Sequence, residues 1–274
     1  MSSVQSHARG WSPRHELRLA LVAWQFLTRV PLPARWVSWM GYQDDWLHDS
    51  ARHFPLVGAL VGSLACAVYA AASLMFTPAL AVGLSMACSL LVTGGFHEDG
   101  WADTCDGLGG SASRERALEI MKDSRIGAYG AMGLVMMLGL KAAALAALPV
   151  AVAAGSMLLA HAVSRAVAVS LLRVLPYAGD VGHAKAKPMA QQLSGPGWVV
   201  AWCWVGLAAL VALACGLPIP IAGVALLAAI LAGIHCARWF RARLGGYTGD
   251  CLGAAQQLSE LAAYLGAVVA WRWM

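Results

Sequence analysis

Charged side chains are scarce in this chain. Only 12% of its 274 residues are Asp, Glu, Lys or Arg, whereas 59% are hydrophobic, and the mean hydropathy is +0.64. A soluble domain of this length does not need so much apolar sequence. The composition therefore argues against an ordinary soluble protein and favours an integral membrane protein.

Several catalytic and binding patterns are also missing. The seven cysteines are scattered and form no CxxC pair, which argues against a zinc site and against a disulfide framework. There is no Gly-x-Ser-x-Gly motif, Walker loop or Cys/His nucleophile pair, so covalent catalysis has no obvious nucleophile. The net charge is +5, yet no basic stripe interleaved with aromatics occurs, and we predict no nucleic-acid partner.

What the chain has instead is a series of apolar runs, several of them near the roughly 20 residues that cross a bilayer. We predict seven transmembrane helices, at Phe54–Phe76, Pro78–Thr93, Ala128–Leu148, Pro149–Leu172, Gly197–Cys215, Pro218–Cys236 and Leu252–Trp271. Leu17–Val30 is shorter and carries Arg18 and Arg29, so we expect an interfacial or re-entrant helix there. The predicted fold is an all-α polytopic membrane bundle in one domain.

Within this single domain we expect a flexible lead at 1–14, an interfacial helix and polar loop at 15–53, and the transmembrane bundle at 54–272. A further helix at Ser111–Lys122 should lie outside the bilayer, and the loop Tyr177–Gly197 is long enough to act as a lid. Nearly all Lys and Arg residues fall on links at one face, which the positive-inside rule makes cytoplasmic. Lipid is thus a predicted partner, and the oligomeric state, a homo-oligomer included, stays open.

Half of the acidic residues lie in one short window between two apolar runs. Of 14 Asp and Glu residues, seven fall there: Glu98, Asp99, Asp103, Asp106, Glu115, Glu119 and Asp123. On a helix, Asp103 and Asp106 follow Asp99 at i+4 and i+7, which places three carboxylates on one stripe. Oxygen-only donors suit Mg²⁺ or Mn²⁺, and the neighbouring glycines let a phosphate approach closely. The pattern predicts a metal-bridged phosphate site; a solvated acidic helix end is the alternative.

Residues beside this stripe are further candidates. Glu98 suits a ligand or a base, and His97 suits a ligand, a base or a structural hydrogen bond. Asp123 offers another metal ligand. Lys122 and Arg125 suit phosphate oxygens, although cations at a membrane border also snorkel.

Three charges inside apolar runs, Lys141, Arg165 and Glu260, are also candidates, because a charge in hydrocarbon needs a partner or a cavity. Asp250 follows the glycine-rich turn Gly245–Gly249 at the head of the last predicted span. It can cap that helix or bind an ion.

Five segments in order resemble the cobalamin synthase family, the adenosylcobinamide-GDP ribazoletransferases. The segments are Phe26–Pro31, Phe54–Gly58, Phe96–Gly110, Lys122–Gly130 and Gly246–Gly253. The resemblance implies a Mg²⁺-dependent transferase of the bacterial inner membrane, with its active site facing the cytoplasm. It would condense adenosylcobinamide-GDP with α-ribazole or its 5′-phosphate, giving adenosylcobalamin or its 5′-phosphate and GMP.

For such a reaction we predict three groups of residues, sorted by role. The catalytic residues are Glu98, Asp99, Asp103 and Asp106. The metal ligands are Glu98, Asp99, Asp103, Asp106 and Asp123, with Mn²⁺ as a substitute for Mg²⁺. The substrate-binding residues are His97, Lys122, Arg125, Arg165 and Asp250.

Two other functions compete with this one. A CDP-alcohol phosphotransferase also places several acids on a membrane-border helix, but its Asp-Gly-x-x-Ala-Arg start and longer acid spacing do not match this sequence from Asp99 to Asp103. A cation- or proton-coupled transporter would use the buried charges Lys141, Arg165 and Glu260 as a relay. No inverted repeat is visible to support transport.

Overall fold

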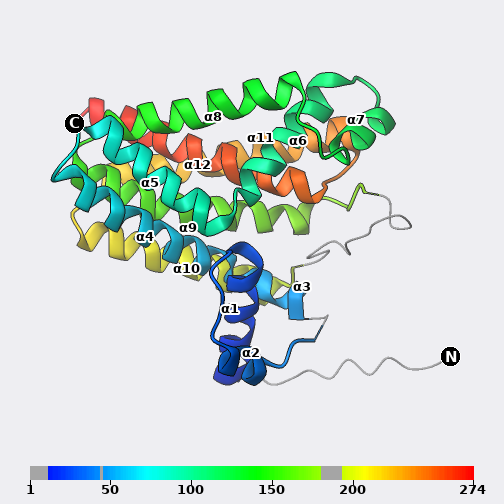
Figure 1. Cartoon of the computed structure of the whole chain (residues 1–274), viewed down its shortest axis with the longest axis horizontal. Coiled ribbons are helices and arrows are strands. Elements are labelled where there is room, and N and C mark those ends of the chain that lie inside the picture. The colour runs from blue at the N-terminus through cyan, green and yellow to red at the C-terminus, as the bar shows by residue number, and fades with distance from the viewer. Residues whose placement is uncertain (1–11, 44–45, 180–192) are drawn as a thin grey trace.

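The computed structural model describes residues 12–43, 46–179 and 193–274 (Figure 1). Within these ranges the chain is built of helices, with one isolated bridge between Tyr177 and Tyr247. The predicted all-α fold is confirmed. The first eleven residues of the expected flexible lead lie outside the described residues, as does 180–192, most of the expected lid.

The long helices follow the predicted apolar runs to within a few residues, except that the helix predicted at Pro218–Cys236 continues to Leu244. In chain order the helices are α1 (Pro13–Leu27), α2 (Ala34–Met40), α3 (Trp46–Ser50), the 3₁₀ helix η1 (Ala51–His53), α4 (Phe54–Ser73), α5 (Pro78–Thr93), α6 (Phe96–Gly110), α7 (Arg114–Met121), α8 (Ala128–Ala146), α9 (Val150–Val174), α10 (Gly195–Ala214), α11 (Ile219–Leu244) and α12 (Gly249–Arg272). Prolines begin several of them, because proline fits the first turn of a helix, where its missing N–H is not needed.

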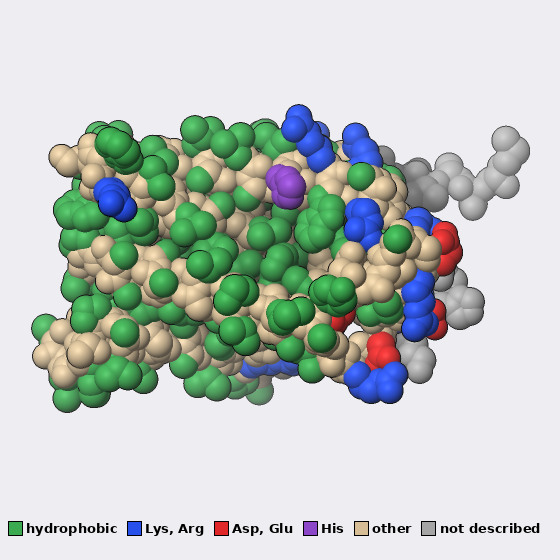
Figure 2. Space-filling view, turned by 90° about the horizontal axis from the view of Figure 1, so that it is seen from above, with side chains coloured by type: hydrophobic (Ala, Val, Ile, Leu, Met, Phe, Trp, Pro, Cys, Tyr) green, Lys and Arg blue, Asp and Glu red, His purple; other side chains and the backbone are tan. Residues whose placement is uncertain are grey.

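The long helices form a bundle with α9 at its centre. Helix α9 packs against α4, α10, α11 and α12, and most of its side chains are buried. The outer helices instead expose apolar side chains, such as Val135 on α8, Leu210 on α10 and Leu227 on α11. Apolar residues cover much of the face in Figure 2, as expected where lipid replaces water as the solvent.

Five helical stretches in the described chain are long and apolar enough to span a membrane: Trp46–Ser73, α8, α9, α10 and α11. Helices α5 and α6 give a sixth if the pair, which bends by 91°, is one span. Helix α12 has 24 residues, but polar side chains such as Gln256 and Glu260 lower its hydropathy. The multi-pass membrane architecture is confirmed; the count of seven stays a prediction.

Charge gathers at one end of the bundle. In Figure 2 the acidic and most of the basic side chains lie at the right, where Figure 1 places α6 and α7. Helix α7 confirms the helix expected at Ser111–Lys122, and its N-cap Ser113 accepts a hydrogen bond from the Arg116 backbone N–H. We call this region the polar end.

The N-terminal arm, residues 13–40, extends away from the bundle axis (Figure 1). Its helix α1 buries Leu19, Ala23 and Leu27, whereas Trp36 and Trp39 of α2 are exposed. Exposed tryptophans are typical of the membrane–water interface. The arm therefore fits the predicted interfacial position.

Candidate functional site

A sharp break between α5 and α6 sets the geometry of the acidic window. Gly94 and Gly95 both have positive φ, +70° and +68°, a left-handed conformation that glycine adopts without steric cost. Two such residues in succession turn the chain by 91°. Helix α6 therefore runs across the polar end, over the N-terminal turns of α8 and α12, instead of continuing along α5.

Glycines let α6 and α12 approach closely. A Cβ on Gly100 would lie 2.9 Å from the Asp250 carbonyl oxygen, and one on Gly253 would lie 3.1 Å from the His97 carbonyl oxygen. Side chains at either position would push the helices apart. This contact brings Asp250 to the acids of α6, although the two segments are some 150 residues apart in the chain.

The acids of α6 line a cavity of about 430 Å³ at the α5–α6 break. Its charged lining residues are Arg29, Glu98, Asp99 and Asp103. The loop after α7 contributes Ser124 and Ile126 to the lining. The structure thus brings three of the predicted acids, Glu98, Asp99 and Asp103, to one cavity.

Burial, and after it mutual repulsion, raises the pKa of two carboxyls in this acidic cluster. Burial, together with the charges of Asp250, Asp99 and Asp106, raises the pKa of Asp103 to about 7. Burial and the charge of Asp99 raise the pKa of Asp250 to about 6. Both carboxyls lie at the polar end, outside the predicted spans. Carboxylates that repel one another in this way favour a bound cation.

The carboxylates of the cavity match the way in which proteins usually bind Mg²⁺. Within the described ranges, no group of three or more His, Cys, Asp or Glu side chains forms a ready-made metal site. Mg²⁺ rarely needs one, because it keeps several waters and is bound through one or two carboxylates plus substrate phosphates. Asp99 and Asp103, one helical turn apart on the cavity wall, can supply these carboxylates.

Asp106 makes a different contact. Its Oδ2 accepts a hydrogen bond from the Gly127 backbone N–H at 2.7 Å, and its Oδ1 accepts one from the Gly130 backbone N–H at 2.8 Å. These are N–H groups of the first turn of α8, which lacks a side-chain cap of its own. Asp106 therefore caps α8 from a neighbouring helix and is absent from the cavity lining, so its predicted metal role stays a prediction.

We expect Asp106→Ala to lower the free energy of unfolding by about 2 kcal/mol, because it removes two hydrogen bonds to a buried carboxylate at a helix N terminus. Thermal unfolding of the purified protein in detergent measures the change. Asp49→Ala, which removes a more exposed acid on α3, is the matched control. Equal stability of the two variants would contradict the capping role.

Asp123 and its neighbours form a separate feature. The Asp123 carboxylate accepts hydrogen bonds from Arg125 Nη2 at 2.6 Å and Nε at 3.0 Å, and this pairing lowers the pKa of Asp123 to about 2. Arg125 is exposed and Lys122 lies at the C-terminal end of α7. None of the three lines the cavity. The predicted metal ligand Asp123 is thus engaged with a cation from its own loop.

His97 and Arg165 lie deeper in the protein. Both are buried and line a largely apolar pocket with Leu27, Phe54 and Leu252. Arg165 donates from Nη1 to the His161 carbonyl oxygen at 2.9 Å. Neither residue lines the acidic cavity, so their substrate-binding roles stay predictions.

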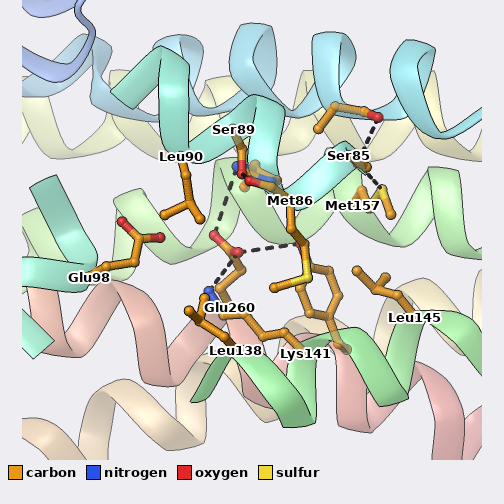
Figure 3. Close-up of a pocket in the computed structure, with 13 residues that line it drawn as sticks. Ser85, Met86, Ser89, Leu90, Glu98, Leu138, Lys141, Leu145, Met157 and Glu260 are labelled. Carbon is orange, nitrogen blue, oxygen red and sulfur yellow. Dashed lines mark hydrogen bonds and ion pairs between the residues drawn. The ribbon is translucent and has the colours of Figure 1, made fainter. Parts of the chain in front are cut away.

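A buried ion cluster lies next to the site, formed by Lys141, His161, Arg165 and Glu260. Lys141 Nζ is 2.8 Å from Glu260 Oε1, and Arg165 Nη1 is 3.7 Å from Glu260 Oε2. Gln256 donates to Glu260 Oε2 at 2.6 Å. Figure 3 shows Lys141 and Glu260 joined inside a pocket that Lys141, His161 and Glu260 line. Helices α8, α9 and α12 are tied together at this point.

Glu98 connects the ion cluster to the acidic cavity, since it lines both pockets. Its Oε1 accepts a hydrogen bond from Gln257 Nε2 at 2.8 Å, and Gln257 Oε1 accepts one from Lys141 Nζ at 2.6 Å. Its Oε2 is buried and has no hydrogen-bond partner among the described residues. Gln257 was not among the predicted residues, although two adjacent glutamines in an apolar helix were a usable signal.

The hydrogen bonds at the start of α12 decide whether Asp250 is the N-cap residue of this helix. The hydroxyl of Thr248 caps this helix and accepts a hydrogen bond from the Cys251 backbone N–H at 3.2 Å. Asp250 is therefore not the N-cap residue, and its carboxylate lies in the first turn near Asp99. Asp250 is absent from the cavity lining, so its substrate-binding role stays a prediction.

Comparisons with known proteins agree on one family. The family model described as cobalamin-5-phosphate synthase matches residues 19–268. An adenosylcobinamide-GDP ribazoletransferase of Leptothrix cholodnii is 59% identical over 255 residues, covering 92% of this chain and 95% of that protein. Proteins of the same name from Polaromonas naphthalenivorans and Vibrio cholerae are each 44% identical, covering 92% of this chain and 98% and 94% of their own lengths. No solved structure matches.

Proposed function

The chain belongs to the cobalamin-5-phosphate synthase family, and on that premise we propose that it joins adenosylcobinamide-GDP to α-ribazole or its 5′-phosphate in a reaction that depends on Mg²⁺. The observation that carries the proposal is the cavity at the α5–α6 break, lined by Glu98, Asp99 and Asp103. The relatives' names supply the substrates. The acid-lined cavity supports a cation-assisted phosphoryl transfer.

In the proposed reaction a ribazole hydroxyl oxygen forms a bond to the phosphorus attached to the corrinoid side arm. The bond between that phosphorus and the oxygen bridging to GMP breaks, GMP leaves with the electron pair, and the hydroxyl proton is released. A bound Mg²⁺ would neutralise negative charge on the diphosphate. Asp99 and Asp103 would hold this ion.

Glu98 suits the part of proton acceptor or of orienting group. It is half-buried, it lines the cavity, and Gln257 fixes one of its carboxylate oxygens. A base needs to be held within reach of the proton it takes. Asp250, whose pKa burial and the charge of Asp99 raise to about 6, is the alternative acceptor near neutral pH.

We also propose that the polar end faces the cytoplasm of a bacterial inner membrane. The support is the concentration of Lys and Arg there, including Arg114, Arg116, Arg241 and Arg243, because cytoplasmic loops carry an excess of basic residues. In this orientation charged nucleotide substrates reach the cavity without crossing the bilayer.

The test is release of GMP by purified protein in lipid nanodiscs given adenosylcobinamide-GDP and α-ribazole. We expect release only with both substrates, support by Mg²⁺ or Mn²⁺, and loss with a chelator. Undiminished release in the chelator would refute the metal dependence. Inverted membrane vesicles should turn over added substrates and right-side-out vesicles should not; the reverse would refute the orientation.

A further inference from the structure

We propose that Arg29, in the N-terminal arm, binds the diphosphate of the nucleotide-bearing substrate and makes the arm part of the active site. This inference rests on the proposed function above and adds a recognition residue to it. The turn that carries Arg29 joins α1 to α2. It approaches the acidic cavity from outside the helices that supply the acids.

Hydrogen bonds hold this turn in place. Thr28 donates from both its backbone N–H and its hydroxyl to the Trp24 carbonyl oxygen, at 3.0 and 2.8 Å. Trp24 Nε1 donates to the Val30 carbonyl oxygen at 3.2 Å. The Arg29 backbone N–H donates to the Val92 carbonyl oxygen at 2.7 Å, near the end of α5. Arg29 is therefore fixed to the bundle at the α5–α6 break.

The Arg29 side chain lies over Gly94. A Cβ on Gly94 would be 2.6 Å from Arg29 Nε and 2.7 Å from Arg29 Cγ, so glycine at this position leaves room for the arginine stem. Gly94 also needs its positive φ for the break. The residue that turns the chain into α6 is thus the one against which Arg29 packs.

The charges that line the cavity indicate a function for Arg29. Among the described residues that line the cavity, Arg29 is the one cation beside Glu98, Asp99 and Asp103. Lys122, Arg125 and Arg165, the cations predicted for substrate binding, do not line it. Within the described ranges no carboxylate pairs with the Arg29 guanidinium.

A guanidinium is well suited to phosphate recognition. Its planar fork donates two parallel hydrogen bonds to phosphate oxygens. Phe96, the first residue of α6, lines the same cavity, and the first N–H groups of a helix favour an anion. The side of the cavity that carries Arg29 therefore suits the diphosphate, and the carboxylates suit the cation that accompanies the diphosphate.

The test compares Arg29→Gln and Arg29→Lys with Arg35→Gln, a matched exposed arginine of the same arm outside the cavity. For Arg29→Gln we expect the KM for adenosylcobinamide-GDP to rise about 10- to 100-fold, the range for losing charge-assisted hydrogen bonds. The KM for α-ribazole and the melting temperature should stay unchanged. Arg29→Lys, which keeps the charge but loses the fork, should fall between the wild type and Arg29→Gln.

Direct binding measurements distinguish recognition of the diphosphate by Arg29 from a purely structural role of this residue. Arg29→Gln should weaken the binding of adenosylcobinamide-GDP. Its affinity for adenosylcobinamide, which lacks the diphosphate, should equal that of the wild type. Equal loss for both ligands, or kinetics like those of Arg35→Gln, would overturn the role of Arg29 while wild-type turnover upholds the proposed function. A wild-type protein without turnover would instead refute the proposed function.

Discussion

Replacing Asp99 or Asp103 with Asn is expected to lower kcat/KM by about 10³-fold, or roughly 4 kcal/mol of transition-state stabilisation. Both carboxylates line the cavity, and the proposal assigns them to the cation that offsets charge on the diphosphate. Asn keeps the size of the side chain but removes the negative charge. The loss should therefore appear in turnover and not in folding.

The assay is GMP release at saturating Mg²⁺, with the melting temperature measured on the same preparations. Glu119→Gln is the matched control, because Glu119 lies in the same acidic window but is exposed on α7 and paired with Arg116. Calorimetric titration with Mn²⁺ in the presence of substrate should show binding to the control and none to an Asp99→Asn/Asp103→Asn double variant. Near-normal turnover of either single variant would refute the assignment.

Glu260→Ala is expected to lower the free energy of unfolding by about 3 to 5 kcal/mol, the range for breaking a buried ion pair. Glu260 is only 6% exposed and is the anion of the buried ion cluster, next to Lys141, His161 and Arg165. Without it, Lys141 and Arg165 would face each other in a low-dielectric interior. Unfolding followed by tryptophan fluorescence in detergent measures the effect.

The contacts of the buried ion cluster also predict which variants lose more stability than others. Lys141→Met should cost less than Glu260→Ala, because Glu260 then keeps Arg165 and the hydrogen bond from Gln256. Glu119→Gln, which breaks an exposed pair, should change stability little. If Lys141→Met proves the more damaging, or if Glu260→Ala unfolds like the wild type, the cluster does not hold α8, α9 and α12 together as described.

Local sequence patterns were sufficient for the helices. Apolar runs bounded by proline or glycine predicted α4, α5, α8, α9 and α10 to within a few residues, because each run must bury or face lipid along its whole length. The acidic stripe was predicted to be helical, and α6 is. The number of spans was harder to predict, because α12 carries polar side chains. Its neighbours bury these side chains, but they lower the hydropathy by which a membrane span is identified.

The candidate site was predicted in part. Glu98, Asp99 and Asp103 share a cavity because four residues make about one helical turn, a local relation. Asp106 continues the same pattern but turns to the N terminus of α8, because unpaired N–H groups lie within its reach. Arg29 was assigned to an interfacial helix, since nothing local shows that its turn lies against the α5–α6 break.

By itself the sequence determined that this chain is a multi-pass helical membrane protein with an acidic helix at one face, because hydropathy and spacing act over a few neighbouring residues. The resemblance of five ordered segments, and not hydropathy, indicated the cobalamin synthase family. The tertiary structure alone decided which polar groups meet: Asp250 with Asp99, Gln257 with Glu98, Glu260 with Lys141, and Arg29 with Gly94. These pairs are separated by 65 to 159 residues in the sequence, so their contacts depend on where glycines let helices approach and where the chain bends.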